Sequence, residues 1–189
     1  MHKNYLFTSK RLGFRNWTAS DLTEFASMNA DKAVMKYFPE PLTTEETAEL
    51  TERLQKHYIK NGYTYYATDR LENGEFIGFI GFAFQEYHSK YTPAIDMGWR
   101  LKPSAWGYGY ATEGAKRCLE FGFNDLGFET IIAVCTENNR PSEKVMQKIG
   151  MTKLGAFNHP NLKDYPDYER CLCYKITKDK WQQNTSHTK

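Results

Sequence analysis

The sequence predicts an α/β (α+β) domain in which a mixed, mostly antiparallel sheet of about seven strands is flanked by about four helices. Strand-like and helix-like segments alternate along all 189 residues, without an internal repeat or a Pro/Gly-rich linker. Hydrophobic residues at 40% and charged residues at 25% are typical of a globular protein with one core. We expect a single domain over residues 1–183, followed by a flexible tail over 184–189.

The first third of the chain predicts one strand and two helices. Residues 11–17 have the pattern of a short strand, and 18–29 that of a helix with an apolar stripe. The stronger helix prediction covers 43–62, because Thr43 and the Glu three positions later form a capping box. Gly62 supplies the stop signal.

The middle of the chain predicts three consecutive antiparallel strands. Residues 63–69 and 75–87 are strand-like, and Asn-Gly at 73–74 between them is a strong hairpin signal. Residues 93–101 form the third run.

The last part of the chain predicts two helices and three strands. A glycine-rich segment opens a helix within residues 105–123, and 130–136 is a continuous apolar run typical of a strand buried on both faces. Residues 141–150 form a short helix, and 153–158 and 168–176 are closing strands.

Charge and cysteine usage exclude several classes of function. The net charge of +2 is small and dispersed, so we expect no nucleic-acid partner, and no apolar run approaches membrane-spanning length. The N-terminus has no apolar core of a signal peptide, so we expect a cytoplasmic protein. We expect buried thiols rather than a metal site or disulfides at the four cysteines, Cys118, Cys135, Cys171 and Cys173.

Two segments carry the functional signal. In "WGYGYATEGA", Gly107 and Gly109 precede a helix that carries Thr112, and free amides at a helix N-terminus bind phosphates. A plain tight turn is the alternative, and neither a P-loop nor a complete dinucleotide fingerprint is present. In "NNRPSEKVMQKIGM", Asn139 and Ser142 follow the buried strand, where both are also common as turn and cap residues.

Together these segments resemble the GNAT acyltransferases of the RimJ/RimL type. The resemblance runs nearly end to end, through "SKRLGFRNWTASDL", "MKYFPEPLTTEET", "IDMGWRL", "WGYGYATEGA" and "NRPSEKVMQKIGM". It implies a GNAT-like fold with acetyl-CoA as co-substrate and no metal. The implied cofactor-binding residues are Trp99, Arg100, Leu101, Trp106, Gly107, Tyr108, Gly109, Tyr110, Ala111, Thr112, Asn139 and Ser142.

The resemblance also assigns roles and shows one departure from the family pattern. The strand at 93–101 would pair with the pantetheine arm, with a bulge at Gly98 that frees an amide for the thioester oxygen. Ser142 would hydrogen-bond the departing thiolate. Tyr108 stands between the two glycines, where relatives usually carry a basic residue.

The general base and the acceptor pocket are less specific in the sequence. Asp96 and His159 are catalytic candidates beside Ser142, Glu86 is a further candidate base, and a water without a dedicated base is the alternative. The expected acceptor-binding residues are Tyr37, Phe38, Glu86 and His159.

We therefore expect an N-acetyltransferase that acts on a primary amine, either a small molecule or a protein N-terminus. The amine would attack acetyl-CoA directly in a ternary complex, with the protein as a monomer or homodimer. The alternative is a catalytically inactive CoA-binding sensor or scaffold.

Overall fold

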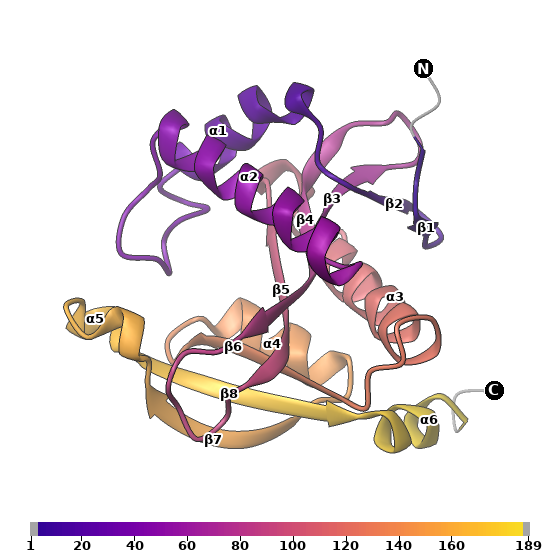
Figure 1. Ribbon diagram of the computed structural model, residues 1–189, viewed down its shortest axis with the longest axis vertical. Coiled ribbons are helices and arrows are strands. Elements are labelled where there is room, and N and C mark those ends of the chain that lie inside the picture. Colours follow the sequence, from indigo (N-terminus) through magenta and orange to yellow (C-terminus); the bar gives the residue numbers. More distant parts are fainter. Residues whose placement is uncertain (1–3, 187–189) are drawn as a thin grey trace.

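The computed structural model describes residues 4–186, which form one eight-stranded sheet with helices on both faces (Figure 1). The strands lie in the order β1-β2-β3-β4-β5-β6-β8-β7. Their bounds are β1 Phe7–Thr8, β2 Leu12–Arg15, β3 Tyr65–Arg70, β4 Phe76–Gln85, β5 Ala94–Leu101, β6 Thr130–Thr136, β7 Thr152–Asn158 and β8 Arg170–Thr177. The helices are α1 Leu22–Ala30, α2 Thr44–Asn61, α3 Tyr110–Asn124, α4 Arg140–Lys148, α5 Pro166–Glu169 and α6 Lys178–Ser186.

The sheet has two antiparallel parts that meet at a single parallel contact. Strands β1 to β5 form one antiparallel part, and β6, β8 and β7 form the other. Strands β5 and β6 run parallel and pair only at Asp96 and Ile132. Beyond that contact the two parts diverge, as Figure 1 shows.

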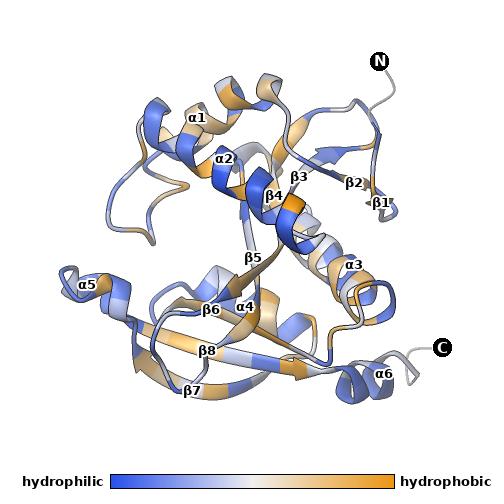
Figure 2. Ribbon diagram, viewed as in Figure 1, coloured by the Kyte–Doolittle hydropathy of each residue, from blue (hydrophilic) through white to orange (hydrophobic). Residues whose placement is uncertain are grey.

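Alternation along the strands divides the apolar residues between two cores. Tyr66 faces the core under α3, whereas Ala67 and Phe79 face the core under α1 and α2. In Figure 2 the central strands carry many hydrophobic residues, whereas α2 and α6 are largely hydrophilic. Helix α3 packs closely on the sheet because Gly114 brings its backbone against Ile80.

The local signals in the sequence act as predicted. The Thr43 side chain accepts a hydrogen bond from the Glu46 amide, and Glu46 reaches back to the Thr43 amide, so the capping box of α2 is complete. Gly62 ends that helix in the left-handed conformation, with φ of 79°. The hairpin turns at Gly74, with φ of 69°.

The described chain holds one strand and two helices more than the approximate counts expected from the sequence. Strand β1 has two residues, too few for a periodic pattern, and α5 has only four. Helix α6 extends to Ser186, so residues 184–186 of the expected flexible tail are helical. The rest of that tail, 187–189, lies outside the described residues.

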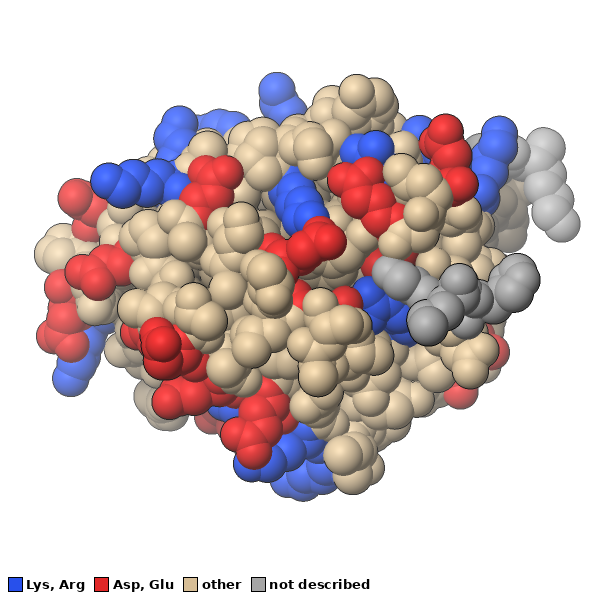
Figure 3. Space-filling view, turned by 90° about the horizontal axis from the view of Figure 1, so that it is seen from above, with Lys and Arg blue, Asp and Glu red and all other residues tan. Residues whose placement is uncertain are grey.

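Surface charges are mixed rather than segregated on the face shown in Figure 3, where basic and acidic side chains are interspersed. Within residues 4–186, no helix is long and apolar enough to cross a membrane.

Candidate functional site

The divergence of β5 and β6 opens a cavity of about 570 Å³ beside the free edge of β5. The Lys102 amide donates to Ile77 of β4. Because amides alternate between the two edges of a strand, those of Trp99 and Leu101 face the gap, and that of Arg100 faces β4. The backbone amides of Trp99 and Leu101, both among the predicted cofactor contacts, are therefore free of strand pairing. Arg100 is also a predicted cofactor contact, but its amide faces β4 and its side chain lines the cavity.

Gly98 does not form the bulge that the sequence analysis expected. Strands β4 and β5 keep one unbroken register from Gly78–Leu101 to Gln85–Ala94. The amides at the gap are free because β6 diverges. Gly98 makes room instead, since a Cβ there would lie 3.0 Å from the Tyr65 ring.

The glycine loop at the start of α3 has the geometry of an anion cradle. Gly107 and Gly109 adopt positive φ angles of 82° and 79°, a conformation that other residues rarely tolerate. Within the described chain, the amides of residues 107–109 donate to no carbonyl or side chain. A Cβ at Gly107 would have no neighbour within 4 Å, so the space before the loop is open. These free donors and the positive end of α3 fit a phosphate group.

Two arginines that the sequence analysis missed hold this loop in place. Arg11 Nη2 donates to the Tyr108 carbonyl at 3.0 Å, and Arg70 Nη2 donates to the Ser104 carbonyl at 2.8 Å. Both guanidinium groups also lie over the Tyr110 ring. Both contacts occupy carbonyl groups of the loop. Because they join residues that are distant in sequence, no local motif predicts them.

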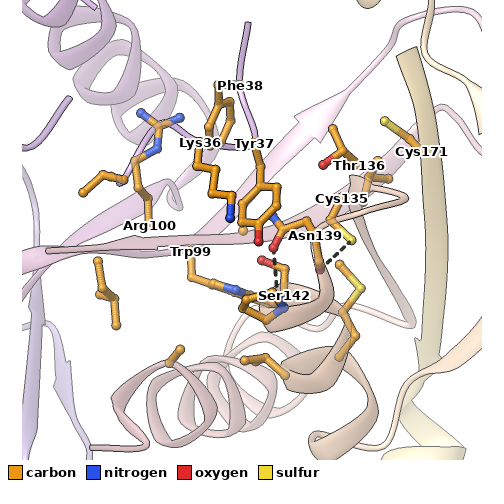
Figure 4. Close-up of a pocket in the computed structure, with 18 of the residues that line it drawn as sticks. Lys36, Tyr37, Phe38, Trp99, Arg100, Cys135, Thr136, Asn139, Ser142 and Cys171 are labelled. Atoms are coloured by element: carbon orange, nitrogen blue, oxygen red, sulfur yellow. Dashed lines mark hydrogen bonds between the residues drawn. The ribbon is translucent and has the colours of Figure 1, made fainter. Parts of the chain in front are cut away.

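Asn139 and Ser142 lie at the start of α4, on the other side of the gap (Figure 4). The Asn139 side chain caps the helix by accepting the Ser142 amide at 3.2 Å. The Ser142 hydroxyl has no hydrogen-bond partner among the described residues and lines the cavity. The arrangement therefore offers one free hydroxyl donor at a helix N-terminus.

Asp96 is buried at the base of the gap and is bound by a tyrosine that the sequence analysis did not select. The Tyr65 hydroxyl donates to Asp96 Oδ2 at 2.6 Å, and Asp96 Oδ1 is buried without a hydrogen-bond partner among the described residues. Burial raises the pKa of Asp96 to about 7, although the hydroxyl of Tyr65 and the backbone of Val134 oppose this rise. The pairing of β3, β4 and β5 brings these residues together.

His159 lines the cavity but is already engaged. Its Nδ1 accepts the Asn161 amide at 3.2 Å, so the neutral ring carries its proton on Nε2. The ring also packs 4.2 Å from that of Tyr87, and burial lowers the pKa of His159. A neutral imidazole held in this way has no free lone pair for a proton.

The other predicted acceptor residues divide between the cavity and the surface. Tyr37 and Phe38 line the cavity from the loop between α1 and α2, together with Lys36 (Figure 4). Glu86 is exposed and is not among the lining residues. Of the predicted loop residues, Trp106 and Ala111 line the cavity, whereas the others lie beyond it. No cluster of metal-ligating side chains is present in residues 4–186.

The cysteines are ordinary buried thiols. Cys135 and Cys171 line the cavity wall, and burial raises the pKa of each thiol to about 12. Thiols with such pKa values stay protonated at neutral pH and are poor nucleophiles. All four cysteines are free.

Comparison with known proteins identifies the family. The model of the acetyltransferase (GNAT) domain matches residues 11–152. An uncharacterized N-acetyltransferase, YnaD of Bacillus subtilis, is 36% identical over 150 residues, which cover 79% of this chain and 84% of the relative. The FsC-acetyl coenzyme A-N(2)-transacetylase of Aspergillus fumigatus is 31% identical over 113 residues, or 57% of this chain and 48% of the relative.

A solved structure agrees with these sequence matches. The GNAT-family acetyltransferase from Bacillus anthracis superposes with a TM-score of 0.74 at 28% identity, covering 91% of this chain and 98% of that one. The fold, the divided sheet and the sequence matches lead to one conclusion: this chain is an enzyme of the GNAT acetyltransferase family.

Proposed function

We propose that this enzyme transfers an acetyl group from acetyl-CoA to a primary amine by direct attack within a ternary complex. One observation carries the proposal: the free edge of β5, the start of α4, and Trp106 and Ala111 at the two ends of the glycine loop line the same cavity. An extended pantetheine arm would pair with the amides of Trp99 and Leu101 as an added strand. The pyrophosphate would bind the free amides of residues 107–109.

The chain supplies donors for both charges that develop in the reaction. A free β5 amide at the gap stabilises the carbonyl oxygen as it gains charge, an effect worth about 3 kcal/mol for a well-placed donor. The unpartnered Ser142 hydroxyl donates to the departing thiolate. No covalent enzyme intermediate is needed, in agreement with the high pKa of the Cys135 thiol.

Asp96 is the best of the three sequence candidates for the general base, since Glu86 is exposed and lies outside the cavity lining. Asp96 lines the cavity, and its pKa of about 7 suits acceptance of a proton from the attacking amine near neutral pH. Tyr65 holds the carboxylate in position through its hydroxyl. We assign His159 to packing and capping, because its Nδ1 lone pair is occupied.

The proposal also covers the branch of the family, the acetyl donor, the cellular compartment and the acceptor. The quoted motifs favour the RimJ/RimL branch, and the name of the fungal relative supports acetyl-CoA as the donor. The four free thiols support a reducing, cytoplasmic compartment. The proposed acceptor is either a small-molecule amine or a protein N-terminus.

Calorimetric titration with acetyl-CoA tests the cradle, with Gly109→Trp as the probe variant. The indole would fill the space before the loop, so micromolar binding by the natural protein is expected to be lost. Gly127→Trp is the matched control, since Gly127 also has a positive φ, 69°, with open space around it, but lies in the turn after α3. Undiminished affinity in Gly109→Trp contradicts the loop assignment.

Thiol release over a panel of amines and N-terminal peptides then tests turnover. Transfer to some members of the panel supports the proposed enzyme and separates small-molecule from peptide acceptors. Tight acetyl-CoA binding without any transfer would instead identify the CoA-binding sensor or scaffold.

A further inference from the structure

The Arg100 side chain lines the cavity without a carboxylate partner. Among the described residues, no Asp or Glu oxygen lies within the 4.0 Å of an ion pair with this guanidinium. Within residues 4–186, its only hydrogen bond runs from Nη1 to the neutral Asn29 Oδ1, at 2.7 Å, and Nε is buried without a partner there. Burial lowers the pKa of Arg100 to about 10, which still leaves it charged at neutral pH.

The surroundings fix this charge in place. Asn29 is fully buried and donates to Thr47, so it holds Nη1 rigidly. The ring centroid of Phe38 lies 4.2 Å from the guanidinium carbon, and that of Phe79 lies 5.4 Å from it. Figure 4 shows the guanidinium beside Phe38. A cation ordered against rings and one amide keeps donors for an anion that the protein itself does not supply.

A second arginine of this chain shows which group these hydrogen-bond donors can bind. This arginine, the buried Arg15, binds the Asp69 carboxylate through Nε at 2.7 Å and Nη2 at 3.0 Å. The same Nε and Nη2 atoms of Arg100 make no hydrogen bond to the described chain. This edge of a guanidinium matches the two oxygens of a carboxylate.

The position of Arg100 assigns the missing carboxylate to the acceptor rather than to acetyl-CoA. Alternation along β5 places the Arg100 side chain on the same face as Asp96, opposite Met97 and Leu101. Asp96 is the only carboxylate among the cavity-lining residues, which also include the cation Lys36. The wall around Arg100 therefore attracts an anion.

Building on the proposed function, we propose that the acceptor is an amine that also carries a carboxylate, which binds to the guanidinium of Arg100. The amine then attacks near Gly98, and its proton passes to Asp96. A free amino acid and a peptide with an acidic first residue share this chemistry.

Matched pairs of acceptors test the proposal. Thiol release is measured with the common amino acids, with their amides, and with peptides that begin with Asp or Asn. The carboxylate form of a pair is expected to show about 10- to 100-fold higher kcat/KM, the range of a charge-assisted contact. Preference for amino acids or for Asp peptides distinguishes the two sources.

Three variants locate the effect. Arg100→Met is expected to lower kcat/KM for carboxylated acceptors to the level of their amides, and calorimetry checks that the variant still binds acetyl-CoA. Asn29→Asp keeps the shape of the site but gives Arg100 an internal carboxylate, so it should raise KM for carboxylated acceptors about tenfold. Lys36→Met removes the other cation that lines the cavity and serves as the control. This variant should retain the preference for carboxylated acceptors.

Binding measurements separate this proposal from the proposed function. Calorimetry with CoA present compares N-acetylamino acids with their amides, independently of turnover. Equal binding of both forms, or an equal loss of both in Arg100→Met, overturns the role of Arg100. Absence of acetyl-CoA binding overturns the proposed function instead.

Discussion

At the residue scale, the chemistry of the site depends on side chains whose partners come from other strands. Asp96 would be an ordinary surface carboxylate with a pKa near 3.9 if the strand stood alone. Burial at the base of the gap raises its pKa to about 7. Tyr65, which reaches it across the space left by Gly98, keeps its own proton because burial and the Asp96 charge raise its pKa.

The raised pKa of Asp96 predicts the pH dependence of the reaction. The ionised carboxylate accumulates as pH rises through about 7. We therefore expect the contribution of Asp96 to make kcat/KM rise with pH up to about 7 and to level off above it. Asp96→Asn should lower the rate about 10²- to 10⁴-fold and remove the inflection near pH 7. Steady-state kinetics between pH 5 and pH 9, at about unit intervals, measure both effects.

Tyr65→Phe provides the matched comparison for this pH profile. The Tyr65 hydroxyl stabilises the ionised form of Asp96, so its removal should move the inflection to higher pH. An unchanged profile in both variants would remove Asp96 from the role of base.

The raised pKa of Asp96 also affects the stability of the fold. Its effect on the pH dependence of stability is opposite in sign to that of a carboxylate whose pKa is lowered on folding. Because the folded pKa exceeds the unfolded one, the folded state holds the proton more tightly. The contribution of Asp96 to stability is therefore lost as pH rises from about 4 to about 7.

At the element scale, helix α3 depends on two kinds of glycine that serve different purposes. Gly107 and Gly109 precede the helix and turn the loop through positive φ angles. Gly114 lies within the helix, where its missing side chain sets the distance to the sheet. A Cβ there would lie 2.3 Å from Ile80 Cδ1 and 3.3 Å from Leu12 Cδ1.

Gly114→Ala should therefore destabilise the protein despite the better helix propensity of alanine. Crowding against fully buried residues costs about 1–3 kcal/mol, against a gain of about 1 kcal/mol from propensity. Urea unfolding measures the difference, and Lys116→Ala on the exposed face of α3 should change stability by less than about 0.5 kcal/mol. A more stable Gly114→Ala protein would contradict the close packing of α3.

At the scale of the whole molecule, a buried ion cluster joins the N-terminal segment to the sheet. Arg15 of β2 binds Asp69 of β3 and Asp21 before α1, with shortest N–O distances of 2.7 Å. Burial alone would raise the pKa of Asp21, but the hydrogen bonds from Arg15 and Thr18 lower it overall. Its stabilising contribution is therefore present above about pH 4 and is lost as pH falls further.

Arg15→Met should lower the free energy of unfolding by about 3–5 kcal/mol, because two buried carboxylates lose their cation. Urea unfolding at pH 7 measures the loss. Lys56→Met breaks the exposed pair with Glu52 and serves as the control, with an expected change of at most about 1 kcal/mol. Similar effects of the two variants would show that burial does not govern the Arg15 cluster.

The sequence by itself determined the features that depend on neighbours along the chain. The capping box at Thr43, the Gly62 stop, the Gly74 hairpin turn and the strand at 130–136 all follow local rules of backbone geometry and periodicity. The glycine loop and the start of α4 were also visible, because each is a contiguous motif.

Only the tertiary structure decided which side chains meet at the site. The gap arises because β5 and β6 pair at Asp96 alone, and no local pattern encodes where two strands diverge. The contacts of Asp96 with Tyr65 and of Arg100 with Asn29 cross 31 and 71 positions of sequence. Such contacts depend on strand order and register, which local sequence patterns do not encode, so the placement of the Arg100 side chain in the cavity wall was not visible in the sequence.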